Sequence, residues 1–233
     1  VRFLGRRPYR PTWQWQRELV AQRKAAAIPD TLLLLEHDPV VTVGRNAGTG
    51  SLLMDEAAYA AKGVELVISD RGGDATFHGP GQVVGYPIVD LAPDKKDIRA
   101  FVRLLEQVMI DTCADYGVEA GRYPGEPGAW LMGPDGAPDR KIGAVGLRFS
   151  RWITHHGFAF NVCPDLGYFD LIVPCGIQGK GVTSLQRETG RRIPLAEVMD
   201  RLAQHFERLF GATRVTAGAG SAILPGPAEG ADG

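Results

Sequence analysis

Two strand-like segments near residue 150 lie so close together in the chain that they constrain the whole fold. "IGAVGLRFS" spans 142–150 and "WITHHGFAFNV" spans 152–162, and both have the composition of strands. A parallel pair needs a crossover of a dozen or more residues, whereas an antiparallel pair needs only a tight turn. The sequence therefore predicts an antiparallel hairpin around Ser150 and Arg151, which argues against a purely parallel Rossmann-type sheet.

Apolar periodicity predicts helices that cover this sheet. The strongest runs from Asp97 to Tyr116, and another begins at Pro194 and ends at Gly211. Weaker helical patterns lie at Trp13–Ala27 and Asp55–Ala61. Further strand candidates are 31–37, 40–44, 64–69, 82–89 and 129–132. A mixed α/β or α+β fold follows from these elements.

The composition favours one folded domain. A chain of 233 residues with 44% hydrophobic and 23% charged residues buries a sizeable core. We expect a single folded domain over 1–211 and a flexible Gly/Ala/Pro-rich tail over 212–233.

Charge and hydropathy exclude several classes of protein. A net charge of −1 gives no global field for nucleic acid. No segment reaches the roughly 18 apolar residues that cross a bilayer, so we expect a cytoplasmic protein without membrane partners. Three cysteines without C-x-x-C spacing predict neither a disulfide scaffold nor a zinc site.

The segment "RGGDATFHGPGQVVGYP", residues 71–87, concentrates glycines around His78. It is no dinucleotide loop, because "GPGQVVG" has one residue too many and precedes a strand. "GIQGKGVTS" also fails as a phosphate-binding P-loop. A tight turn remains the alternative, but glycines on both sides of Thr76 and His78 predict a slot in which backbone approaches a ligand.

Cys175 is the candidate nucleophile. "VPCGIQGKGVTSLQ" sets it between proline and glycine in an irregular segment, whereas Cys113 and Cys163 fit buried small hydrophobes. A thiol needs a nearby cation to form the reactive thiolate. His37 and His205 have the settings of a loop and a helix surface. The sequence leaves several activators open: His78, His155, His156, Lys141 and Lys180.

Four ordered motifs together resemble the lipoyl(octanoyl) transferase family. They are "RGGDATFHGPGQVVGYP", "KIGAVGLR", "THHGFAFNV" and "PCGIQGKGVTSL", and the match runs from about Leu33 to Leu185. The resemblance implies the fold of lipoate and biotin protein ligase catalytic domains, with a mixed, largely antiparallel sheet. It also implies transfer of an octanoyl group from acyl carrier protein to a lysine of lipoyl domains or of the glycine-cleavage H protein, with no ATP, cofactor or metal.

The resemblance also implies roles for individual residues. Cys175 becomes the acyl acceptor and Lys141 its partner, so the histidines lose the activating role. The acyl slot is formed by three segments: Arg71, Gly72, Gly73, Asp74, Ala75, Thr76, Phe77 and His78; Ala144, Val145 and Gly146; Gly157, Phe158 and Ala159. His78 either positions the acyl head, orients Lys141 or makes a structural hydrogen bond.

Two alternatives to this activity remain at this point. One is an amidotransferase that takes octanoyl from H protein, and the other is a non-catalytic acyl-binding domain. Since carrier proteins and lipoyl domains are acidic, clustered arginines are candidate docking surfaces. One cluster is Arg2, Arg6, Arg7 and Arg10, and the other is Arg140, Arg148, Arg151, Arg187, Arg191 and Arg192. We expect a monomer.

Overall fold

A computed structural model describes the chain except for residues 49, 93–95, 174–179 and 213–233. Eight strands of the described part form the main sheet, in the order β1-β2-β6-β10-β9-β8-β7, with β11 paired to β9. Neighbours are antiparallel except β1 with β2 and β11 with β9, so the predicted mixed, largely antiparallel sheet is confirmed. The strands are β1 (Arg2–Arg7), β2 (Thr31–His37), β6 (Gln82–Ile88), β7 (Gly121–Tyr123), β8 (Glu126–Met132), β9 (Pro138–Ser150), β10 (Ile153–Asn161) and β11 (Gly181–Val182).

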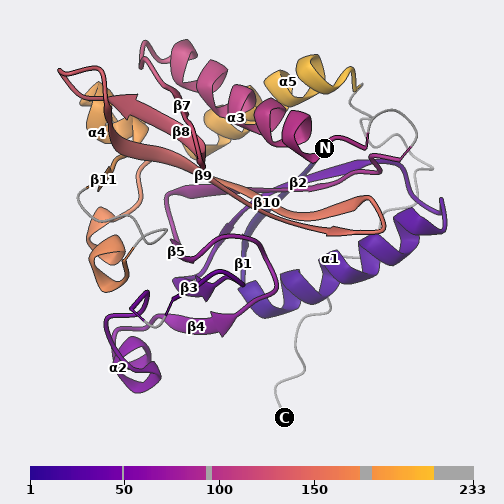
Figure 1. The fold of residues 1–233 in the computed structure, drawn as a ribbon, viewed down its shortest axis with the longest axis horizontal. Helices are drawn as coiled ribbons and strands as arrows, with labels where there is room; N and C mark the ends of the chain where they lie inside the picture. The colour runs from indigo at the N-terminus through magenta and orange to yellow at the C-terminus, as the bar shows by residue number, and fades with distance from the viewer. Residues whose placement is uncertain (49, 93–95, 174–179, 213–233) are drawn as a thin grey trace.

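Helices cover both faces of this sheet (Figure 1). On one face, α3 (Ile98–Asp115) and α5 (Leu195–Phe210) enclose a core that includes Phe158 and Phe160 of β10. On the other face, α1 (Tyr9–Lys24) packs Trp15 and Leu19 against β2 and β6. Because helices cover both faces of the sheet, side chains on both sides of β2 and β6 are buried, and these strands consist almost entirely of buried residues.

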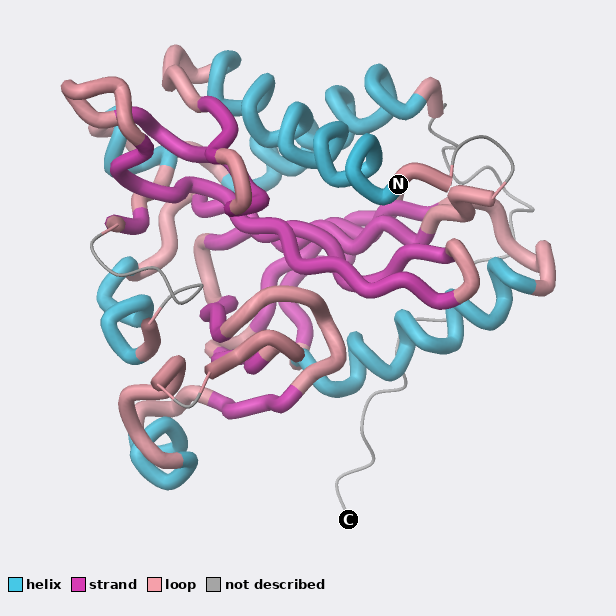
Figure 2. Tube along the Cα trace, in the orientation of Figure 1, coloured by secondary structure: helices cyan, strands magenta, loops and turns pink. Residues whose placement is uncertain are grey.

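A small second sheet lies beside the main one (Figure 2). It has the order β4-β3-β5 and consists of β3 (Val40–Val43), β4 (Glu65–Ile68) and β5 (Ala75–His78). The helix α2 (Glu56–Ala61) and the 3₁₀ helix η1 (Leu166–Leu171) pack on it through Tyr59 and Phe169. The short helix α4 (Leu185–Thr189) follows β11.

The predicted hairpin is present between β9 and β10. Ser150 pairs with Ile153, so Arg151 and Trp152 form a two-residue loop. Their φ angles are 51° and 71°, the left-handed values that a type I′ turn requires at both central residues. The right-handed strand twist matches this turn type, which is why two ordinary side chains accept these φ values.

Helix predictions were accurate where a cap marks the end. The side chains of Asp97 and Asp55 accept hydrogen bonds from the third residue beyond and begin α3 and α2. Gly211, at a φ of 62°, ends α5. The prediction for α1 placed both ends too late: the helix begins at Tyr9 because Pro11 falls within its first turn, where proline is tolerated.

Strand predictions were accurate for the long apolar segments and failed for short ones. β2 has the predicted bounds, β3 and β6 are one residue shorter at their ends, and β4 is one residue shorter at each end. β1, β5, β7 and β11 were not predicted: arginine or glycine interrupts β1, β7 and β11, and β5 is a four-residue segment with too few apolar residues. The loop setting given to His37 among the candidate activators was wrong: as the predicted strand 31–37 implied, it is the last residue of β2, and it is fully buried.

Two further expectations concern the ends of the chain and the membrane. Residues 213–233 lie outside the described residues, so the flexible tail and the single domain over 1–211 stay predictions. Among the described residues, no helix has the length and apolar character needed to cross a bilayer.

Candidate active site

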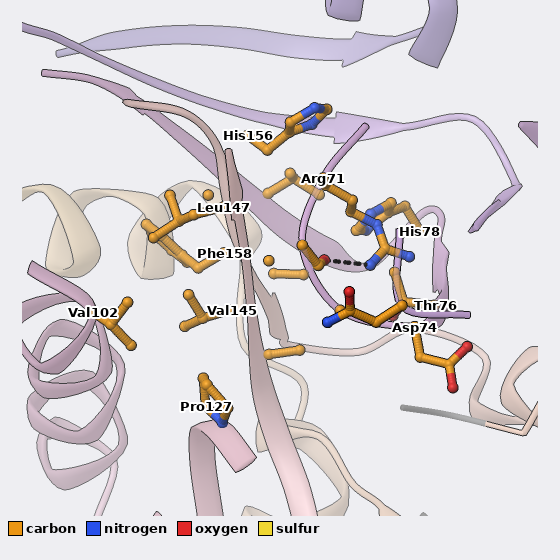
Figure 3. Close-up of a pocket in the computed structure, with 18 of the residues that line it drawn as sticks. Arg71, Asp74, Thr76, His78, Val102, Pro127, Val145, Leu147, His156 and Phe158 are labelled. Carbon is orange, nitrogen blue, oxygen red and sulfur yellow. Dashed lines mark hydrogen bonds between the residues drawn. The ribbon is translucent and has the colours of Figure 1, made fainter. Parts of the chain in front are cut away.

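A cavity of about 520 Å³ lies where the loop before β5 meets β9 and β10. One wall is apolar and the other carries polar and charged groups, an arrangement that suits a ligand with an apolar body and a polar head. Figure 3 shows Val102, Val145, Leu147 and Phe158 on one side and Arg71, Asp74, Thr76 and His78 on the other.

The three predicted slot segments meet at this cavity. Every residue of 71–78, 144–146 and 157–159 lines it except Phe77, and Lys141 lines it as well. Phe77 lies between Thr76 and His78 on β5, so strand alternation turns its ring away. That ring stacks on Tyr168 with centroids 4.6 Å apart, in the core under the small sheet.

The glycines allow one backbone to lie on another. The amide of Gly72 donates to the carbonyl of Leu147 over 2.8 Å. A Cβ on Gly72 would lie 3.0 Å from that carbonyl oxygen, and one on Gly146 would lie 3.1 Å from the oxygen of Gly72. A Cβ on Gly157 would lie 2.0 Å from the oxygen of Gly85. At these three glycines the missing side chain makes room for neighbouring backbone, while the same segments still line the cavity.

Arg71 holds the loop before β5 in place through hydrogen bonds. Its side chain is buried, and Nε and Nη2 donate to the hydroxyl and carbonyl of Thr42 over 2.9 and 2.6 Å. Nη1 donates to the carbonyl of Gly72 over 3.0 Å (Figure 3). These bonds join the loop to β3 while the guanidinium still contributes positive charge to the cavity wall.

Lys141 is a buried cation on β9. Its Nζ lies 3.9 Å from a carboxylate oxygen of Glu126 and 4.6 Å from the centroid of the Trp130 ring. These two contacts hold Nζ of Lys141 at the cavity wall, between a carboxylate and an aromatic face.

Cys175 lies outside the described residues, as does the whole segment 174–179. The chain on its carboxyl side is described: Val182 of β11 pairs with Lys141 of β9. Lys180 donates to the carbonyl of Pro138, so it is engaged at the surface of β9. The other two thiols are poor nucleophiles, since burial raises the pKa of Cys113 and of Cys163.

Four of the five histidines lie in two groups, His37 with His78 and His155 with His156, and burial lowers the pKa of all four. Burial lowers the pKa of His78 to about 3, that of His37 to about 4 and that of His155 to about 4. His156, at a φ of 54°, donates to Asp70 over 2.8 Å. This hydrogen bond holds the pKa of Asp70 at about 2.

Asp70, His155 and His156 also place three potential metal-ligand atoms within 4.8 Å of one another. The surroundings do not suit a cation, because Arg148 lies 3.9 Å from Asp70 and Trp13 donates to the same carboxylate. The hydrogen bond from His156 takes up an oxygen of this carboxylate as well. The group is better described as a hydrogen-bonded ion cluster.

The predicted arginine clusters are divided in the structure. Arg6 and Arg10 pair with Asp38 and Glu65, and Arg140 makes two 2.7 Å bonds to Glu188. Arg187, Arg191 and Arg192 instead line a shallow hollow beside α4.

Comparisons with known proteins agree with this geometry. The chain matches the Lipoyl protein ligase A/B catalytic domain over residues 8–207. It is 50% identical to the octanoyltransferase of Rubrobacter xylanophilus over 212 residues, which cover 90% of this chain and 92% of that protein. It is 46% identical to the octanoyltransferase of Myxococcus xanthus, covering 92% of this chain but 60% of that longer protein.

Solved structures show the same fold at low sequence identity. A bipartite lipoate protein ligase from Thermoplasma acidophilum has a TM-score of 0.70 at 15% identity, covering 92% of this chain and 85% of that one. Lipoate-protein ligase A bound with ATP has a TM-score of 0.66 at 17% identity, covering 92% and 87%. By its fold, and by its identity to curated relatives over most of its length, the chain belongs to the lipoyl protein ligase A/B catalytic domain family and, within it, to the octanoyltransferases.

Proposed function

We propose that the protein transfers an octanoyl group from the thioester of acyl carrier protein, through a thioester on Cys175, to a lysine of lipoyl domains or of H protein. The observation that carries the proposal is Lys141, a buried ammonium at the wall of an acyl-sized cavity and in register with the strand that follows the Cys175 segment. The thiolate of Cys175 and this ammonium are the two groups that acyl exchange between sulfur and nitrogen needs.

In the first half-reaction, the Cys175 thiolate attacks the donor's thioester carbonyl. The carbon–sulfur bond to the carrier breaks, and the leaving thiolate takes a proton from the Lys141 ammonium. Octanoyl-Cys175 and neutral Lys141 result. Because one thioester replaces another, no ATP is needed.

In the second half-reaction, the neutral amine of the acceptor lysine attacks octanoyl-Cys175. The thiolate of Cys175 leaves, and the proton lost by the amine passes to Lys141, restoring the ammonium. Formation of an amide from a thioester drives this step. In this proposal the apolar chain lies against Val145, Leu147 and Phe158, which line the cavity, and the carbonyl lies toward the polar wall.

The intact mass of the protein tests the proposal. We expect the wild type, mixed with octanoyl-acyl carrier protein without ATP, to gain one octanoyl group and to lose it when apo lipoyl domain is added. Cys175→Ser should gain nothing, and Lys141→Ala should gain it slowly. Loading from octanoyl-H protein but not from the carrier would indicate the amidotransferase instead, and octanoate binding without any mass gain would indicate an acyl-binding protein.

A further inference from the structure

A row of buried polar side chains runs from the cavity into the sheet next to Lys141. His78 ends β5, Gln82 begins β6, and Asn161 ends β10. Gln82 and Asn161 are direct partners in the antiparallel β6–β10 pair, so their side chains lie together. All three are at most 7% exposed. Since an unpaired buried amide is costly, their hydrogen bonds are expected to be specific.

The bonds form a chain with a single direction. Nδ1 of His78 lies 2.7 Å from Oε1 of Gln82, and Nε2 of Gln82 donates to Oδ1 of Asn161 over 2.9 Å. Nδ2 of Asn161 then donates to the carbonyl of Thr183 over 3.0 Å. The amide of Thr183 in turn donates to the carbonyl of Lys141 over 3.0 Å.

Backbone carbonyls fix this direction because they only accept hydrogen bonds. The carbonyl of Thr183 requires the NH₂ group of Asn161, which leaves Oδ1 of Asn161 toward Gln82. The carbonyl of Phe77 lies 3.2 Å from Nε2 of Gln82 and requires its NH₂ group too. Oε1 of Gln82 therefore faces His78, and the proton of the neutral imidazole must be on Nδ1.

This arrangement leaves Nε2 of His78 as a lone-pair acceptor. The residue lines the cavity, and within the described part of the chain no group donates to Nε2. An octanoyl chain carries no hydrogen-bond donor, whereas the amine of an acceptor lysine does. Gln82, Asn161 and Lys141 also line one small cavity of about 20 Å³, so the amide chain and the catalytic lysine share a boundary.

We propose that Gln82 and Asn161 are positioning residues that hold His78 in its Nδ1–H tautomer, so that Nε2 accepts a hydrogen bond from the incoming amine and orients its lone pair toward the acyl carbonyl. The claim that His78 orients the incoming amine rests on the proposed function. The claim that His78 is the Nδ1–H tautomer does not, because it follows from the hydrogen bonds alone.

Nitrogen-15 spectra of the imidazole groups in the full-length protein test the tautomer. The signals of His78 are assigned by their loss in His78→Gln. We expect Nδ1–H in the wild type at pH 7 and a shift to Nε2–H in Gln82→Met, which has a similar shape but replaces the amide oxygen with a thioether sulfur, a much weaker acceptor. Gln16→Met is the matched control, because Gln16 is equally buried and bonds to the amide of His156 instead. An Nε2–H tautomer in the wild type overturns the proposal, and that result needs no variant other than His78→Gln, which serves for the assignment.

Single-turnover rates test the positioning role. In Gln82→Met we expect attack by the lipoyl-domain lysine on octanoyl-enzyme to slow by about tenfold, the effect of one lost hydrogen bond, while acyl loading changes by less than about threefold. Unchanged rates despite an altered tautomer, or equal slowing of both half-reactions, overturn it. A protein that keeps the tautomer but accepts octanoyl from no donor refutes the proposed function and leaves the tautomer assignment standing.

Discussion

The two ends of the cavity hold a histidine in opposite ways. At the Lys141 end, the neutral amide of Gln82 holds His78 through Nδ1, whereas at the far end the ionised carboxylate of Asp70 holds His156 through Nε2. Lys141 and Leu147, the register partner of His156, are separated by roughly 20 Å of strand at 3.3 Å per residue. The Lys141 end thus combines a cation with a neutral histidine, and the Asp70 end holds a fixed ion cluster.

Removal of the Lys141 side-chain amine should have the largest effect on the activity, because it tests the end of the cavity assigned to proton transfer. We expect Lys141→Met to lower octanoyl transfer by about 10²–10⁴-fold, the range for loss of a general acid–base group, while the protein stays folded. Lys24→Met is the control, since Lys24 is exposed and donates to Ser150 at the hairpin. Transfer rates with octanoyl-acyl carrier protein measure both. If the transfer rate of Lys141→Met fell by less than about tenfold, another group would have to be the one that transfers the proton.

The neutral histidines near the Lys141 end should make stability fall in mild acid. The pKa of His37 is lowered by burial from 6.5 to about 4, so below pH 6.5 the unfolded chain binds a proton that the folded chain refuses. The contribution of His37 to the free energy of unfolding is therefore fully present above about pH 6.5. It declines by roughly 3 kcal/mol as the pH falls to about 4. Urea denaturation of wild type and His37→Gln between pH 7 and 4.5 measures it, and we expect a steeper slope for the wild type. Parallel slopes would contradict the neutral assignment.

Charge reversal shows which end the protein partners approach. Arg187 and Arg191 line the hollow beside α4, just beyond the β11 strand that pairs with Lys141, whereas Arg148 lies near Asp70. We expect Arg187→Glu with Arg191→Glu to raise the KM for octanoyl-acyl carrier protein by about tenfold at low salt, and added salt to narrow the difference. Arg148→Glu should change it less. The reverse order would place the docking surface at the Asp70 end.

The sequence predicted those parts of the fold and site that local chemistry decides. Asp97 and Gly211 mark helix ends, and the short spacing at Ser150 decides the hairpin, because caps and turns depend on neighbouring residues. β5 and β11 have too few apolar residues to be recognised and exist through pairing with β3 and β9. The slot segments and Lys141 were identified by resemblance, and the structure places them around one cavity apart from Phe77.

The amide chain is the part of the site that sequence reasoning missed. Gln82 and Asn161 each lie within a quoted motif, and each is a polar residue that borders an apolar run at the end of a strand, which was the available signal. Their significance depends on being register partners across β6 and β10, a relation between residues 79 positions apart. No local pattern specifies that pairing.

Loss of the Asp70 carboxylate should have the smallest effect of these changes, and the effect should be on stability at low pH. The hydrogen bond from His156 holds the pKa of Asp70 at about 2, below its ordinary value of 3.8, so its stabilisation is present above about pH 4 and is lost as pH falls toward 2. Asp70 is partly exposed, so solvent screening limits this stabilisation to about 1 kcal/mol. Asp70→Asn should therefore have a flatter stability curve than the wild type between pH 5 and 2.5, measured by urea denaturation. Asp38→Asn, which removes an exposed ion pair with Arg6, serves as the control. If Asp70→Asn instead slows octanoyl transfer as much as Lys141→Met, the far end takes part in the chemistry and the division of the cavity into a reacting end and a structural end is wrong.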